Sequence, residues 1–143
     1  MKFVKIFCVN IFLLMILSVT GIGQNISQIT FINELDVKSA AAYGDALSMF
    51  RFQEGTASVS NSYMLSGYSD ESKLTKGMAS LMMARYLNLK KSLMYNIFGT
   101  ERYAYRACLA DNLFSGYGSE NDLMSGAELI ELFSKVKEFK NGR

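Results

Sequence analysis

The chain has 143 residues, a formal net charge of +2, two cysteines, and no histidine, tryptophan or proline. Histidine is the usual general base and the commonest metal ligand, so its absence argues against an enzyme and against a bound metal. We expect no cofactor either, because the sequence has no glycine-rich phosphate-binding loop.

The first 23 residues resemble a secretory signal peptide. Lys2 and Lys5 give a positive start, residues 6–19 are apolar apart from two positions, and Gly21 and Gly23 supply the small residues that a signal peptidase reads. We expect cleavage after Gly23 and a periplasmic or secreted product, part of a bacterial cell envelope. Residues 6–23 also approach the minimum length that spans a bilayer, so an uncleaved N-terminal anchor is the alternative.

Cleavage would alter the charge and the cysteine content of the remaining single domain, residues 24–143. It would remove two of the 15 basic residues and leave a neutral balance against the 13 acidic ones. We therefore expect no nucleic-acid partner, and membrane contact only through the N-terminal segment. Only Cys108 would remain, so no internal disulfide can form, and its neighbours Ala107 and Leu109 are typical of a buried small residue.

Apolar residues recur at helical spacing through residues 24–143, which predicts an all-α fold, a compact bundle of about four to six short helices. In chain order we expect an extended segment at 26–32 and helices at 40–53, 58–65, 76–87, 91–97, 101–112 and 126–138. Thr75 and Thr100 are candidate N-caps, and Ser125 with Glu128 forms a capping box. Asn88 is expected to end the helix that starts at 76.

Two stretches of the sequence are nearly the same, LSGYSDESKLTKG at 65–77 and FSGYGSENDLMSG at 114–126. They align without a gap, and the alignment pairs Leu74 with Leu123 and Gly77 with Gly126. We interpret them as two degenerate helix-turn-helix units, around residues 58–88 and 100–139, with a more irregular third copy suggested near Tyr43. In each unit, Ser-Gly-Tyr is expected to close the preceding helix with a left-handed glycine and to fold its tyrosine back.

The segment from Phe98 to Phe133 resembles the S-layer homology repeat. The matching features are Phe98, the predicted helix at 103–113 and the turn Ser-Gly-Tyr-Gly at 115–118, while residues 74–77 resemble the start of the family's next helix. The resemblance implies a compact helical module that holds proteins to a cell-wall polymer. It also implies that Lys76 would meet an anionic polymer.

Five residues are candidates for ligand binding. Tyr68 and Tyr117 would stack on a sugar if both rings were exposed and Lys76 lay near one of them; the alternative is that they cover helix ends. Arg102 and Arg106 share one helix face at i and i+4, where solvated or salt-bridged arginines are the alternative. The methionines Met82, Met83 and Met94 are expected to fill gaps among the helices, and a methionine-rich groove for a partner is the alternative.

Acidic residues in the two turns do not indicate a metal site. Asp70, Glu71, Glu120 and Asp122 lack the spacing of a calcium-binding loop, and we interpret them as solvated turn acids.

Together these features favour an exported, non-catalytic domain that binds a cell-envelope component, either a cell-wall polymer or an envelope protein. The alternative is a structural or assembly subunit of the envelope, tethered by an uncleaved N-terminal anchor. An enzyme ranks third, and would be a carboxylate-based hydrolase that uses Glu128.

Overall fold

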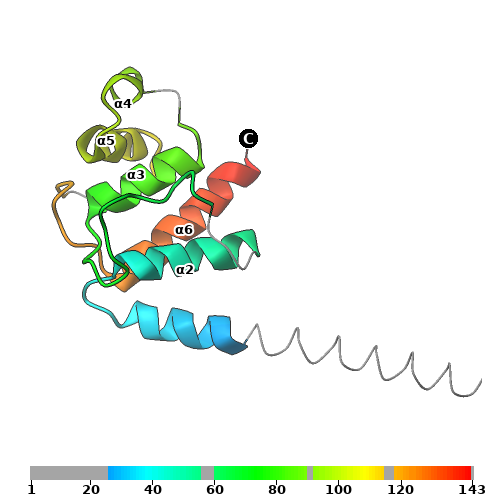
Figure 1. The fold of residues 1–143 in the computed structure, drawn as a ribbon. Helices are drawn as coiled ribbons and strands as arrows, with labels where there is room; N and C mark the ends of the chain where they lie inside the picture. Colours follow the sequence, from blue (N-terminus) through cyan, green and yellow to red (C-terminus); the bar gives the residue numbers. More distant parts are fainter. Residues whose placement is uncertain (1–25, 56–59, 90–91, 115–117, 143) are drawn as a thin grey trace, which may run out of the picture. The chain divides into compact units, whose positions relative to one another are not determined.

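A computed structural model describes residues 26–55, 60–89, 92–114 and 118–142. Within these ranges the chain forms helices joined by turns and loops, and its β-structure is limited to two isolated bridges (Figure 1). The all-α prediction is confirmed for this part of the chain. Of the described residues, 26–34 belong to one compact unit and 35–142 to another. The predicted signal peptide lies outside the described residues, among which we find no helix of the length and apolarity needed to cross a bilayer.

Five helices follow residues 26–36, which are themselves helical. They are α2 (Tyr43–Glu54), α3 (Lys76–Tyr86), α4 (Leu93–Phe98), α5 (Glu101–Ala110) and α6 (Gly126–Asn141). The predicted first residues of α3, α5 and α6 are confirmed, while α6 continues three residues beyond the expected end. In the second unit α5 packs on α3, and α4 packs on α5 (Figure 1).

Two predicted elements are wrong. Residues 26–32 were expected to be extended because they are rich in β-branched side chains, yet they are helical, and the Thr30 hydroxyl donates to the Ile26 carbonyl at 3.0 Å. A helix was also expected at 58–65. Residues 60–65 instead form turns around Tyr63, whose buried ring stacks on Phe50 at 4.1 Å while its hydroxyl donates to Glu54. Residues 58 and 59 lie outside the described ranges.

The predicted caps explain where α3 and α6 begin. The Thr75 hydroxyl accepts a hydrogen bond from the Met78 N–H at 3.1 Å. Ser125 and Glu128 form the expected capping box, in which each side chain accepts the other residue's N–H, at 3.2 and 2.8 Å. Thr100 is at the N-cap position of α5, but its hydroxyl makes no capping bond.

Asparagines end α3 and α5, and the prediction that Asn88 ends the helix starting at 76 is confirmed. Asn88 and Asn112 have positive φ angles of 50° and 56° after α3 and α5. The N–H of the next residue then donates to the helix, from Leu89 to Ala84 and from Leu113 to Cys108. Gly67 does have a positive φ of 90°, but it lies in a turn with no helix before it among residues 60–66. The prediction that this glycine closes a helix is therefore wrong, and Gly116 lies outside the described residues.

Three segments meet in a closed ring of backbone hydrogen bonds at the helix starts. The Leu74 N–H donates to the Ala41 carbonyl, the Met124 N–H to the Leu74 carbonyl, and the Ala41 N–H to the Met124 carbonyl, at 2.8–2.9 Å. All three residues are buried, and each directly precedes the N-cap of a helix, α2, α3 or α6. We call these three residues the ring. The same arrangement, a buried ring residue followed by an N-cap and a helix, therefore occurs three times. The segment at 41–43 is the third copy.

The ring also corrects the register of the two similar stretches. Leu74 corresponds in space to Met124 rather than Leu123, because these are the buried residues that join the ring. The turns before them agree with this register: Ser72 N–H bonds the Ser69 carbonyl as Asp122 N–H bonds the Ser119 carbonyl. Sequence identity had aligned the second copy one residue too early.

Phe50 lies where α2, α3 and α6 meet. Its ring is fully buried and approaches Tyr86 of α3 at 5.1 Å and Phe133 of α6 at 4.8 Å, both edge to face. On the other side of α3, Cys108 is buried on α5, with its sulfur 3.7 Å from the Ser80 carbonyl. The expectation of a buried cysteine is confirmed.

Candidate functional site

Lys76, the candidate for an anionic polymer, is already paired. It is the first residue of α3, and its ammonium lies 3.0 Å from a Glu128 oxygen on α6, with only 14% of the side chain exposed. The hydrogen bond to Glu128 raises the pKa of Lys76. The lysine therefore joins two helix starts and does not project as a free cation.

Glu128 is held in its ionised form by the same contacts. Burial alone would raise the pKa of its carboxyl, but hydrogen bonds from Ser125 and Lys76 outweigh burial and lower the pKa. A general acid in a hydrolase needs a raised pKa, so these contacts act against that role. In the structure, Glu128 caps α6 and pairs with Lys76.

The surroundings of Lys76 leave little room for a ligand. A Cβ atom added at Gly118 would lie 2.9 Å from Asp122, 3.2 Å from the Lys76 ammonium and 3.4 Å from the Tyr105 hydroxyl. The adjoining pocket has a volume of about 20 Å³, enough for one water molecule. Of the turn acids, Asp70, Glu71 and Asp122 are exposed and Glu120 is half-buried. Within the described residues, we find no group of three or more acidic or cysteine side chains able to hold a metal ion.

Tyr68 is exposed and held in place. The residue is 41% exposed, its ring lies 6.0 Å from the Tyr43 ring, and its hydroxyl donates to Glu101 at 2.9 Å. The hydrogen bond to Glu101, with some burial, raises the pKa of Tyr68. The ring therefore rests on α2 and α5, and not on a helix that ends directly before Ser66. Tyr117 lies outside the described residues.

Glu101 links Tyr68 to the start of α3. A Cβ atom added at Gly77 would lie 3.0 Å from the Glu101 Cβ, so the glutamate packs directly against the residue that follows Lys76. Tyr68 itself does not line the small pocket beside Lys76. Glu101 thus connects the two candidates, of which Tyr68 is exposed and Lys76 is mostly buried.

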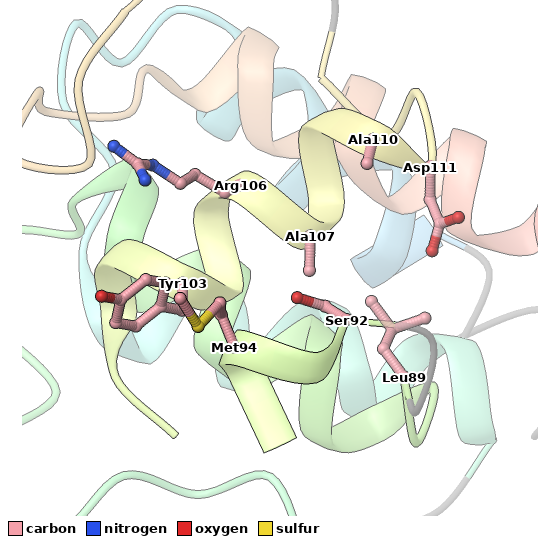
Figure 2. Close-up of a pocket in the computed structure, with 8 residues that line it drawn as sticks. All are labelled: Leu89, Ser92, Met94, Tyr103, Arg106, Ala107, Ala110 and Asp111. Carbon is pink, nitrogen blue, oxygen red and sulfur yellow. The ribbon is translucent and has the colours of Figure 1, made fainter. Parts of the chain in front are cut away.

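Arg102 and Arg106 are both exposed on α5, and Arg106 lines a pocket of about 350 Å³ between α4 and α5. Its lining residues are Leu89, Ser92, Met94, Tyr103, Arg106, Ala107, Ala110 and Asp111. In Figure 2 Arg106 and Tyr103 lie at one end, Asp111 at the other, and Ala107 between them. The middle of the pocket is therefore mainly apolar, apart from the Ser92 hydroxyl, and its two ends carry opposite charges.

The exposed apolar surface of α4 was not predicted. Met94 was expected to fill a gap but is 51% exposed, whereas Met82 and Met83 are buried as expected. The sequence of α4, Leu-Met-Tyr-Asn-Ile-Phe, contains no charged residue, and its large apolar residues fall at i, i+1, i+4 and i+5. This pattern could have indicated a one-sided apolar helix, but not that the apolar side faces outward.

The comparisons with known proteins add no relative: no family model, no curated protein and no solved structure matches the chain.

Proposed function

We propose that this chain is an exported, non-catalytic domain that binds a cell-wall polymer, and that Tyr68 makes the principal contact. The observation that carries the proposal is an exposed tyrosine ring held on both sides, by the Tyr43 ring and by the hydrogen bond to Glu101. The signal-like first segment and the absence of histidine support export and binding without catalysis.

A fixed aromatic ring suits a sugar chain. The flat apolar face of a tyrosine can cover the apolar face of a sugar ring while polar groups beside it bond the hydroxyls. Glu101 supplies such acceptor oxygens directly beside Tyr68. Because both side chains are held by hydrogen bonding before any ligand arrives, little rotamer freedom is lost on binding.

The proposal gives Lys76 a supporting role. An anionic group that bound Lys76 would have to compete with Glu128, whose oxygen lies 3.0 Å from the ammonium. We therefore assign polymer contact to Tyr68 and Glu101. Arg102, on the same helix as Glu101, supplies a positive charge at the edge of this contact, while Lys76 joins α3 and α6.

Sedimentation with purified cell-wall sacculi tests this function. We expect the protein to pellet with sacculi, Tyr68→Ala to lose most of this binding, and Tyr68→Phe to keep it, because phenylalanine retains the stacking face. Met64→Ala is the matched control, since Met64 is 38% exposed and only four residues away. Failure of the wild-type protein to pellet, or full binding by Tyr68→Ala, would refute the assignment.

A second candidate is an assembly subunit of the envelope, held by an uncleaved N-terminal anchor. The exposed apolar side of α4 favours it, because such surfaces commonly mark sites of protein association. Mass spectrometry of the protein from its native membrane fraction separates the two candidates. A chain that begins at Met1 supports the anchor, and one that begins at Gln24 refutes it.

A further inference from the structure

The surface of α4 is apolar, and the proposed function does not use it. Four of its six residues, Leu93, Met94, Ile97 and Phe98, are 73%, 51%, 62% and 54% exposed. Their spacing places them on one side of the helix. We call these four residues the α4 stripe.

The stripe continues onto α5 and into the larger pocket. The Phe98 ring stacks on the Tyr103 ring at 5.1 Å, and Tyr103 and Met94 both line the pocket of about 350 Å³ (Figure 2). Ala107 and Leu89 extend the same apolar lining. The stripe and the pocket therefore form one continuous surface.

The size of this surface is in the range of a protein interface. If one fully exposed large side chain presents about 200 Å², the stripe alone presents roughly 500 Å². The largest apolar patch on a typical monomer is about 300–600 Å² and is often functional. A specific interface buries about 800 Å² on each partner, so the stripe and the pocket rim together supply most of one side.

We propose that the α4 stripe is a self-association surface through which two copies of this chain pair about a twofold axis. Because α4 carries no charged residue, a second copy can face it without repulsion between like charges. Arg106 and Asp111 lie at opposite ends of the pocket, so a twofold pairing with antiparallel α4 helices brings each arginine end toward the partner's aspartate end.

A lipid surface fits α4 less well than a second copy does. Helices that lie on membranes combine an apolar face with lysines and arginines on the polar face. α4 has six residues, and the two that are not in the stripe are Tyr95 and Asn96. Neither offers a cation to a lipid headgroup.

Co-purification of two differently tagged full-length copies, expressed together, tests the pairing. We expect wild-type copies to co-purify. We expect Ile97→Glu to weaken the association by about tenfold or more, because each copy loses an isoleucine that pairing would bury and gains a carboxylate there. Met64→Glu is the control, an exposed apolar residue outside the stripe that should leave pairing intact. Circular dichroism verifies that each variant is folded.

Cysteine cross-linking gives an independent readout. In a Cys8→Ser background, Ile97→Cys should form a disulfide-linked dimer on mild oxidation, because residues near a twofold axis approach their own counterparts. Met64→Cys should remain mostly uncross-linked, and Cys108 is buried. The proposal is overturned if wild-type copies do not co-purify, if Ile97→Glu co-purifies like wild type, or if Ile97 instead mediates binding to phosphatidylcholine vesicles. Sacculus binding does not depend on the stripe, so Ile97→Glu should retain it.

Discussion

Replacing Gly77 by alanine should destabilise the protein, although alanine is the better helix former. Gly77 is the second residue of α3, where alanine would ordinarily be favoured by about 1 kcal/mol. In this fold, a Cβ atom at Gly77 would lie 2.9 Å from the Glu120 carbonyl oxygen and 3.0 Å from the Glu101 Cβ. The Glu120 carbonyl cannot easily retreat, since it accepts the Gly77 N–H at 2.8 Å.

The expected loss follows from three contributions. Overpacking of this kind costs about 1–3 kcal/mol. Moving the turn away also weakens the bonds from Lys76 and Gly77 to Asp122 and Glu120, each with a net value of about 1 kcal/mol. After the gain in helix propensity is subtracted, Gly77→Ala should lower the free energy of unfolding by about 2 kcal/mol.

Urea denaturation followed by circular dichroism measures this change. Ala127 is the matched control, because it is the exposed second residue of α6, and Ala127→Gly should cost about 1 kcal/mol or less. Gly44→Ala should behave like Gly77→Ala, since its Cβ would lie 2.9 Å from the Asp70 Cβ. If Gly77→Ala were as stable as the wild type, the close packing of the turn on α3 would not be a feature of the protein.

Three further outcomes test the caps and the buried groups. Thr75→Ala should cost about 1 kcal/mol of unfolding free energy, whereas Thr100→Ala should cost less than about 0.5 kcal/mol because Thr100 makes no capping bond; equal losses in urea titrations would contradict this. The folded pKa of Glu128 is below its unfolded value, so its contribution is complete above about pH 4.3 and is lost as the pH falls through the folded pKa. Lowering the pH should therefore reduce the free energy of unfolding of the wild type more than that of Glu128→Gln. Parallel plots of this free energy against pH for the two proteins would disprove the linkage. Burial raises the pKa of Cys108 to about 12, so iodoacetamide at neutral pH should modify Cys108 only after unfolding, as peptide mass spectrometry would reveal.

Helix starts were the most predictable part of the fold. A hydroxyl at Thr75 and a Ser-Glu pair at 125 and 128 satisfy backbone donors locally, so the signal lies within a few residues of sequence. The start of α2 carried no such signal, because its N-cap is Ala42. Its donors are instead satisfied by Asp45 and by the carbonyls of a distant turn, with Tyr43 N–H bonding Ser72.

The errors share a cause in long-range packing. The one-residue misalignment arose because leucines and glycines in the two stretches match by identity, while burial in the ring selects Met124 over Leu123. In the candidate site, the position of Tyr68 depends on Glu101 and the ion pair of Lys76 depends on Glu128. Both partners lie far away in the chain. No local pattern could identify these partners.

The ring makes the order of chain synthesis matter for folding. Ala41 and Met124 are among the most distant residues that bond in the second unit, so the ring cannot close until nearly the whole chain is available. Closing loops of this length is slow, because their ordering entropy must be lost before the contact forms. A chain still missing the residues from Met124 onward would leave the Leu74 carbonyl and the Ala41 N–H without their ring partners. Such a chain would remain incompletely folded until its C-terminal segment emerged.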